Sequence, residues 1–189
     1  MIKIIAGKHK NKSIRTPKNN NTRPTSIRLR ETIFNILLHS NNINIKICNT
    51  NVLDLFAGSG SFGFECLSRG FKSCVFVENN IESLKVINEN VRILNEEKNS
   101  KVIKHDATKP LKKNLDINLC FLDPPYKINK ISDILINWAS ADCISKDAIY
   151  ILEKKNDKNY RIPKNFELID SRKQGLSEVI FFKILSSTK

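Results

Sequence analysis

The residue run best suited to chemistry in this 189-residue chain is Asp123-Pro124-Pro125-Tyr126. Two successive prolines fix the backbone angle φ and remove two N–H donors, so the segment presents carbonyl oxygens without competing donors. The Asp123 carboxylate and the Pro124 carbonyl can together accept both hydrogens of an exocyclic amine. Tyr126 offers a flat face on which a base can stack. The run suits a planar amine, whose delocalised lone pair must be localised on nitrogen before it can attack. The alternative is a rigid loop in which the aspartate has no chemical role.

A glycine-rich turn at residues 54–60, Asp-Leu-Phe-Ala-Gly-Ser-Gly, is the second candidate. Glycines between a strand and a helix let the backbone approach a ligand closely. Gly58, Gly60 and Gly63 also match the G-x-G-x-x-G spacing of dinucleotide sites, which alone is a weak signal. Asp54, four positions before Gly58, would repel a pyrophosphate but attract an ammonium group. The turn therefore favours a cationic ligand, with a plain tight turn as the alternative.

Two further acids follow apolar runs. Glu78 is placed to accept both hydroxyls of a ribose, as acids do at this position in dinucleotide folds. Asp106 is a candidate acceptor for an adenine amino group. Taken alone, Glu78 could be a solvated acid at a strand end and Asp106 a capping residue.

Alternating strands and helices must position these groups. Apolar runs predict strands at 52–56, 74–77, 102–103, 119–122 and 148–152, with helices over 61–69, 81–94 and 131–139 between them. Near-continuous apolar strands that alternate with helices indicate a mostly parallel sheet covered on both faces. Ligands of such sheets bind at the carboxyl ends of the strands, where all four candidate groups lie. Residues 166–169 and 179–184 predict a terminal antiparallel pair.

The first 40 residues have a different pattern. Residues 2–6 and 13–15 predict a small hairpin with a basic tip, and residues 16–25 predict a loop. A helix is expected over 26–39, with Leu29, Ile33 and Leu37 on one face and Arg28 and Arg30 off that stripe.

The charge balance is strongly positive: 32 Lys and Arg against 19 Asp and Glu give a net charge of +13. This indicates a polyanionic partner, nucleic acid first and an anionic membrane second, although a codon bias toward Lys would raise the charge without any function. No apolar run approaches the roughly 18 residues of a membrane span, so we expect a cytoplasmic protein. The five cysteines and three histidines show no ligand spacing, so no metal is expected.

Together these residues resemble a known group. The chain is similar to the class I S-adenosylmethionine-dependent methyltransferases that methylate exocyclic amines. More closely, it resembles the bacterial 16S rRNA guanine-N2 methyltransferase family, on Thr22-Arg23-Pro24-Thr25, on residues 30–37 and on Leu67-Ser68-Arg69-Gly70. The resemblance extends over residues 4–182.

The resemblance implies a Rossmann-like α/β fold: a seven-stranded, mostly parallel sheet with an antiparallel last strand. It divides the chain into an N-terminal hairpin and helix extension, residues 1–40, and a methyltransferase domain, residues 41–189. It implies S-adenosylmethionine as the cofactor and 16S rRNA as the partner, within the small ribosomal subunit or an assembly intermediate. A monomer without a membrane partner is expected.

The resemblance also implies roles for individual residues. The expected catalytic residues are Asp123, Pro124, Pro125 and Tyr126. The expected cofactor residues are Asp54, Phe56, Ala57, Gly58, Ser59, Gly60, Glu78, Asn79, Asp106 and Ala107. The expected RNA contacts are Lys8, Lys10, Lys12, Arg23, Thr25, Arg28 and Arg30.

The chain departs from the family pattern at Ile27, where an acid is usual, and at Asn79-Asn80, where an Asp is common. Three alternative functions remain open, and a fourth, a dinucleotide oxidoreductase, is disfavoured. A DNA adenine-N6 methyltransferase shares the Pro-Pro-Tyr run, although such enzymes often carry a separate recognition domain. A protein glutamine methyltransferase usually has Asn where this chain has Asp123. A non-enzymatic nucleic-acid-binding module would not bind S-adenosylmethionine, and a dinucleotide oxidoreductase would leave residues 123–126 unexplained.

Overall fold

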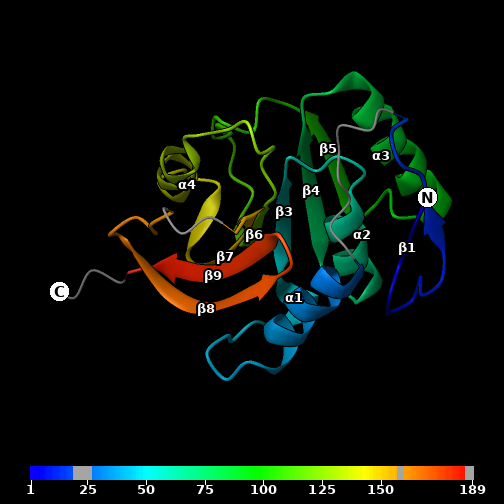
Figure 1. Cartoon of the computed structure of the whole chain (residues 1–189). Coiled ribbons are helices and arrows are strands. Elements are labelled where there is room, and N and C mark those ends of the chain that lie inside the picture. Colours follow the sequence, from blue (N-terminus) through cyan, green and yellow to red (C-terminus); the bar gives the residue numbers. More distant parts are fainter. Residues whose placement is uncertain (19–26, 157–159, 186–189) are drawn as a thin grey trace.

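A seven-stranded sheet forms the centre of the chain, for which a computed structural model describes residues 1–18, 27–156 and 160–185. The strands are β3 (Asn51–Leu55), β4 (Ser73–Glu78), β5 (Ser100–Lys104), β6 (Ile117–Leu122), β7 (Ile144–Lys155), β8 (Phe166–Gln174) and β9 (Ser177–Ile184). Their order in the sheet is β5-β4-β3-β6-β7-β9-β8 (Figure 1). The first five in this order run parallel. The last strand in sequence, β9, lies between β7 and β8 and is antiparallel to both, which confirms the predicted sheet.

Helices cover both faces of the sheet because its strands are apolar on both sides. All five residues of β3 are buried. The helices α1 (Ile27–His39), α2 (Ser61–Ser68) and α3 (Ile81–Leu94) lie on one face, and α4 (Ile131–Ala139) lies on the other (Figure 1). Val52 belongs to the core under α1, α2 and α3, whereas Leu53, the next residue of β3, packs with Trp138 of α4. This alternation is what a two-sided parallel sheet requires.

Aromatic side chains fix α1 and α2 over the middle of the sheet. The ring of Phe62 stacks on Phe121 of β6 with centroids 4.0 Å apart, and Phe34 of α1 stacks on Phe62 at 5.4 Å. Helix α1 therefore shares one core with the rest of the fold. The division of the chain near residue 40 into an extension and a main domain stays a prediction.

The N-terminal hairpin is formed by β1 (Ile2–Lys3) and β2 (Ser13–Ile14), which pair antiparallel as predicted. Ile4 and Ile14 are buried in the same core as α1 and α2. The amide of Lys8 donates to the carbonyl of Ser68, the last residue of α2, at 2.8 Å. The hairpin is thus attached to the helical face of the sheet.

The observed β7 is longer than the predicted 148–152. It begins at Ile144, which pairs with Ile117, and then shifts register so that Ile149 pairs with Leu119. The irregular pairing and the polar residues Lys146 and Asp147 hide its first half from the apolar pattern. Over the described ranges, no helix is long and apolar enough to cross a membrane.

Candidate active site

The carboxyl ends of β3, β4, β5 and β6 bring the predicted chemical groups to one edge of the sheet. A pocket of about 740 Å³ opens there. Its lining comprises Phe56, Glu78, Asn79, Asn80, Ile81, Glu82, Asp106, Ala107, Thr108, Pro125 and Ile128. Residues from the turns after three strands and from the Pro-Pro segment thus surround one space, whose size is ordinary for a small-molecule site.

Glu78 organises the pocket through backbone amides. One carboxylate oxygen accepts from the amide of Gly58 at 2.8 Å, and the other accepts from the amides of Asn79 and Asn80, each at 2.8 Å. A carboxylate offers about four lone-pair positions, so one remains for a ligand hydroxyl. Glu78 therefore ties the glycine-rich turn to the end of β4 and still faces the pocket.

The structure explains why Asn80 can stand where the family pattern commonly has an Asp. The side chain of Asn80 accepts a hydrogen bond from the amide of Ser83 at 3.0 Å and caps α3. Asn is as good an N-cap as Asp. The helix start is therefore preserved without an acid at this position.

The glycine-rich turn adopts a backbone that favours glycine. Gly58 and Gly60 have φ of +57° and +76°, and Phe56 has φ of +60°, which is unusual for a bulky residue. The turn is closed by a hydrogen bond from the amide of Gly60 to the carbonyl of Ala57 at 2.7 Å. Strained backbone of this kind concentrates at functional sites.

Asp54 lies beneath this turn. Its side chain accepts a hydrogen bond from the amide of Gly63, in the first turn of α2, at 3.1 Å. Asp54 is only 2% exposed, and burial, partly offset by the Gly63 hydrogen bond, raises the pKa of its carboxyl to about 8. A buried acid with a raised pKa is stabilised in its charged form by a nearby cation. The site is therefore suited to a positively charged ligand.

The pKa of Asp106 is shifted in the opposite direction from that of Asp54. Its carboxylate accepts hydrogen bonds from the hydroxyl and the amide of Thr108, at 2.7 Å and 3.0 Å. These bonds, the hydroxyl first, lower the pKa of Asp106 below its usual value. The carbonyl of the next residue, Ala107, accepts from the Trp138 indole at 2.8 Å, which fixes this loop against α4. Asp106 is thus an ionised acceptor in the pocket wall.

The Pro-Pro segment begins in the core and ends at the surface. Pro124 is buried, whereas Pro125 is exposed and Tyr126 is 55% exposed. The carbonyl of Pro125 accepts from the amide of Ile128 at 2.9 Å, which closes the turn. Burial first, and then the charges of Glu153 and Asp54, raise the pKa of Asp123 well above its usual value. The segment presents an open aromatic face beside a proton-binding carboxyl group.

The hairpin tip lies far from this edge. Lys8, Lys10 and Lys12 are exposed, and the Lys8 ammonium pairs with Glu96, just after α3, at 2.7 Å. Because α2 and α3 run back from the carboxyl edge of the sheet, their C-terminal ends lie at the opposite edge. The role of the three lysines as RNA contacts stays a prediction, but the fold separates them from Asp123.

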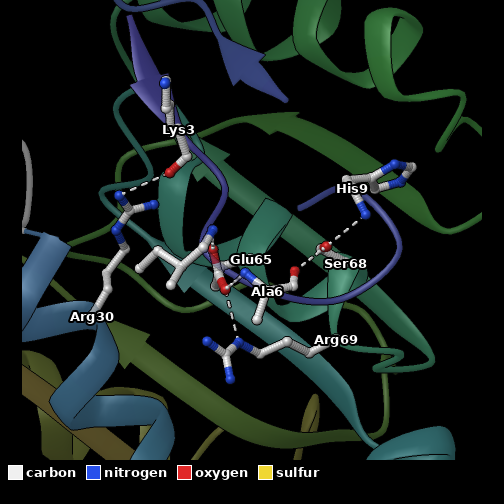
Figure 2. A network of polar contacts seen from close by, with 8 residues as sticks. Lys3, Ala6, His9, Arg30, Glu65, Ser68 and Arg69 are labelled. Carbon is white, nitrogen blue, oxygen red and sulfur yellow. Dashed lines mark hydrogen bonds and ion pairs between the residues drawn. The ribbon is translucent and has the colours of Figure 1, made fainter. Parts of the chain in front are cut away.

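Arg30 requires a correction, because its side chain is completely buried and cannot hold a phosphate in this structure. Figure 2 shows it in a polar network between β1, α1 and α2, where it donates to the Lys3 carbonyl at 3.3 Å. The same network centres on Glu65, which is buried and accepts from the amides of Ile5 and Ala6 at 2.8 Å and 3.0 Å and from Arg69 at 2.8 Å. Arg30 lies outside the apolar stripe of α1, and the sequence therefore predicted it at the surface. Its side chain points inward instead because the buried acid Glu65 attracts it.

Of the remaining predicted RNA contacts, Arg28 is exposed at the start of α1. Arg23 and Thr25 lie outside the described residues.

Asn90 of α3 is a site residue that sequence reasoning missed. It is buried, and its amide nitrogen donates to the carbonyls of Arg15 and of Ser59 at 3.0 Å and 3.1 Å. Its oxygen accepts from the Arg15 amide at 2.8 Å. Asn90 thus joins the end of the hairpin to the glycine-rich turn. A polar residue on the apolar face of a predicted helix was the available signal.

Comparison with known proteins identifies the fold and its chemistry. The sequence model of a family described as Conserved hypothetical protein 95 matches residues 2–183. The chain belongs to this family. YlbH of Bacillus subtilis is 31% identical, over 96% of this chain and 98% of the relative. Ribosomal RNA small subunit methyltransferase D of Haemophilus influenzae is 28% identical, over 93% of this chain and 90% of the relative.

Solved structures agree on the architecture. The chain of yhhF from Escherichia coli superposes with a TM-score of 0.80 and 24% identity, covering 97% of both chains. A SAM-dependent methyltransferase from Aquifex aeolicus superposes with a TM-score of 0.63 and 13% identity, covering 86% of this chain and 94% of its own. The chain therefore has the fold of the class I methyltransferases, the group whose cofactor is S-adenosylmethionine.

The pocket fits this cofactor. S-adenosylmethionine has ribose hydroxyls, an adenine amino group and two cationic centres, the ammonium and the sulfonium. The pocket lining offers Glu78 with acceptor capacity left and the ionised Asp106. Asp54 lies outside this lining, buried under the glycine-rich turn, and its charged form requires a nearby cation. Over the described residues, no group of His, Cys, Asp and Glu is arranged to hold a metal ion.

Proposed function

We propose that this protein transfers a methyl group from S-adenosylmethionine to the exocyclic 2-amino group of a guanine in 16S rRNA of the small ribosomal subunit. The observation that carries the proposal is that Asp123-Pro124-Pro125-Tyr126 adjoins the cofactor pocket, with Pro125 in the pocket wall and Tyr126 exposed beside it. The relative named Ribosomal RNA small subunit methyltransferase D supports the choice of rRNA.

The proposed roles of the cofactor residues follow from the chemistry of the pocket. Glu78 accepts a hydrogen bond from one ribose hydroxyl at the lone-pair position that its three amide donors leave open, rather than from both hydroxyls as the sequence suggested. Asp106 holds the adenine amino group and Asp54 the cationic end, while the remaining turn residues supply close backbone contact. Those remaining predicted contacts are Phe56, Ala57, Gly58, Ser59, Gly60, Asn79 and Ala107. When bound, the cofactor supplies a methyl group already activated by its sulfonium, so the protein chiefly orients the reactants.

Asp123 and Pro124 act on the amine. The Asp123 carboxylate and the Pro124 carbonyl accept its two hydrogens, which turns the nitrogen lone pair toward the methyl group. As the N–C bond forms and the C–S bond breaks, Asp123 accepts the proton that the nitrogen loses. Tyr126 stacks on the base. A base cannot reach this edge while stacked in a helix, so the target must be unpaired or flipped out.

The RNA is proposed to cover the catalytic edge of the sheet. Two exposed lysines, Lys127 and Lys130, follow Tyr126 directly, and we call them the edge lysines. Lys10 and Lys12 are called the tip lysines. Arg28 and the predicted contacts Arg23 and Thr25 belong to the segment that precedes and begins α1. The edge lysines are the better placed to bind phosphates close to the target base.

The protein is proposed to act as a cytoplasmic monomer on the small subunit or an assembly intermediate. The test offers labelled cofactor to unmodified small subunits, free 16S rRNA, DNA and protein. Label in the rRNA, alone or within the subunit, supports the proposal, whereas label in DNA or in protein contradicts it. The Asp123→Asn variant should lose most methyl transfer while its cofactor affinity stays within a few-fold. Equal loss of both would refute the division of roles.

A further inference from the structure

Three strands extend beyond the others at the catalytic edge of the sheet. Strand β6 ends at Leu122, level with the end of β3, and Leu122 pairs with Leu152 of β7. Strand β7 continues for three more residues to Lys155, about 10 Å beyond that level. Strands β9 and β8 accompany it, because Lys155 pairs with Ser177 and Ser177 pairs with Gln174. We call this projecting part the ledge; it comprises residues 153–155 and 172–179.

The ledge stands beside the segment that carries Asp123. That segment follows Leu122 directly, and β7 is the strand next to β6 in the sheet. The far strand of the ledge, β8, is three strand positions from β6, which is roughly 14 Å at about 4.8 Å per strand. At the rise of about 3.4 Å per nucleotide of a stacked strand, this distance corresponds to roughly four nucleotides. A nucleic acid whose target base reaches Asp123 is therefore within reach of the whole ledge.

The exposed charged side chains of the ledge are basic. They are Lys155, Arg172 and Lys173. Over the described residues, no ion pair involves Lys155 or Lys173. One nitrogen of Arg172 donates to Asp170 and to the Ser171 carbonyl, and the side chain is 55% exposed. A guanidinium has five N–H donors, so Arg172 retains donors that face solvent.

The acids of the ledge, Glu153 and Glu178, do not offset this charge at the surface. Glu178 pairs with the ammonium of Lys154 at 3.0 Å, and Lys154 is itself only 4% exposed. The ring of Tyr160 lies 5.2 Å from the same ammonium. Glu153 is 7% exposed. The surface of the ledge is therefore positively charged, and a buried ion pair holds its strands in place.

The other side of the catalytic edge, at the ends of β4 and β5, is acidic. Glu78, Glu82 and Asp106 line the cofactor pocket there. Exposed lysines on that side adjoin these acids. Lys104 is opposite Glu78 in register, and the amide of Lys109 donates to the carbonyl of Asp106 at 3.0 Å. A phosphate backbone is thus attracted by the ledge and repelled by the carboxylates of the pocket wall.

We propose that the ledge binds the RNA backbone that flanks the target guanine, so that the RNA crosses the catalytic edge from Tyr126 toward β8 and leaves the cofactor pocket uncovered. This inference rests on the proposed function for the identity of the nucleic acid. Lys155, Arg172 and Lys173 pair with phosphates close to the target nucleotide. Phosphate contacts fix the position and direction of a strand but carry no sequence information, which stays with the residues that contact the base.

The first test is the binding of free 16S rRNA at several salt concentrations. The double variant Lys155→Gln with Lys173→Gln should lower the affinity about ten-fold or more near 0.1 M salt, and lower the slope of log affinity against log salt by about 2. Lys155→Arg with Lys173→Arg, which keeps both charges, should retain the wild-type slope.

The matched control for this test is Lys72→Gln with Lys101→Gln. It removes two exposed lysines near the amino ends of β4 and β5, at the opposite edge of the same sheet. A slope change in the ledge variant that is no larger than the change in this control overturns the proposal.

The second test maps the RNA that lies next to the ledge. Leu176, in the turn of the ledge, is 64% exposed, and an iron chelate attached to Leu176→Cys should cleave 16S rRNA next to the methylated guanine. The exposed Cys48 provides the control, because it directly precedes β3 and so lies at the opposite edge, while the other four cysteines are buried. The same chelate on Cys48 of the wild type should not cleave there, and identical cleavage from both proteins overturns the proposal. Methyl transfer to DNA or protein instead of rRNA would contradict the proposed function, whereas the salt slope needs no methyl transfer and tests the ledge by itself.

Discussion

The free energy of unfolding of Asp54→Asn should increase relative to that of the wild type as the pH rises. Burial raises the pKa of Asp54 to about 8, against an ordinary value of 3.8 in the unfolded chain. The folded protein therefore holds a proton on Asp54 across the neutral range that the unfolded chain has lost. The stability that this proton provides is complete below pH 4 and is lost as the pH rises toward and through 8. Asn keeps the shape and the acceptor for the Gly63 amide but does not titrate.

The size of the effect follows from the proton difference. Between pH 6 and pH 7 nearly one proton separates the two states, so the wild type loses about 1.3 kcal/mol relative to Asp54→Asn. Between pH 7 and pH 8 it loses about 1 kcal/mol more. Urea unfolding of both proteins at pH 6, 7 and 8 measures the difference, from which the contributions of other titrating groups largely cancel.

A difference that stays constant from pH 6 to pH 8 would refute the reasoning, because Asp54 would then titrate alike in the folded and unfolded states. Asp147→Asn, at an exposed position, is the matched control and should show no such trend. If Asp54 holds the cationic end of the cofactor, saturating S-adenosylmethionine should ionise it. The wild type should then regain its lost stability at pH 7, and Asp54→Asn should bind the cofactor more weakly.

Three further changes test the packing of the glycine-rich turn and the RNA-binding edge. A Cβ at Gly63 would lie 2.3 Å from the Phe76 ring, so Gly63→Ala should lower the free energy of unfolding by about 1–3 kcal/mol; an unchanged urea midpoint would contradict this close packing. Replacing both edge lysines with Gln should weaken binding to 16S rRNA and lower the slope of log affinity against log salt by about 2, more than the same change at the tip lysines; equal slopes would remove the edge from the interface. Arg28→Gln should lower that slope by about 1, and an unchanged slope would exclude Arg28 from the interface.

Local patterns were sufficient for most of the fold. The runs of apolar residues predicted β3, β4 and β6 because a strand buried on both faces leaves a continuous signal. The rule that ligands bind at the carboxyl edge then placed Glu78 and Asp106 in one pocket.

Other features depend on partners distant in the chain. Arg30 lies off the apolar stripe of α1, and only the buried Glu65, in another helix, explains why it points inward. The distance of Lys10 from Asp123 depends on which ends of α2 and α3 the hairpin contacts. Glu153 of β7 belongs to no sequence motif, and that it follows the pair Leu122–Leu152 at the end of β6 is visible only in the register of the two strands.

The central claim is that the residues at this edge direct a methyl group to the exocyclic amine of a guanine. Its most direct test is to incubate unmodified small subunits with labelled S-adenosylmethionine and the protein, digest the 16S rRNA, and identify the labelled nucleoside by mass spectrometry. The account predicts N2-methylguanosine at a single position, lost with Asp123→Asn. Label in N6-methyladenosine, or in no nucleoside although the cofactor binds, would contradict it.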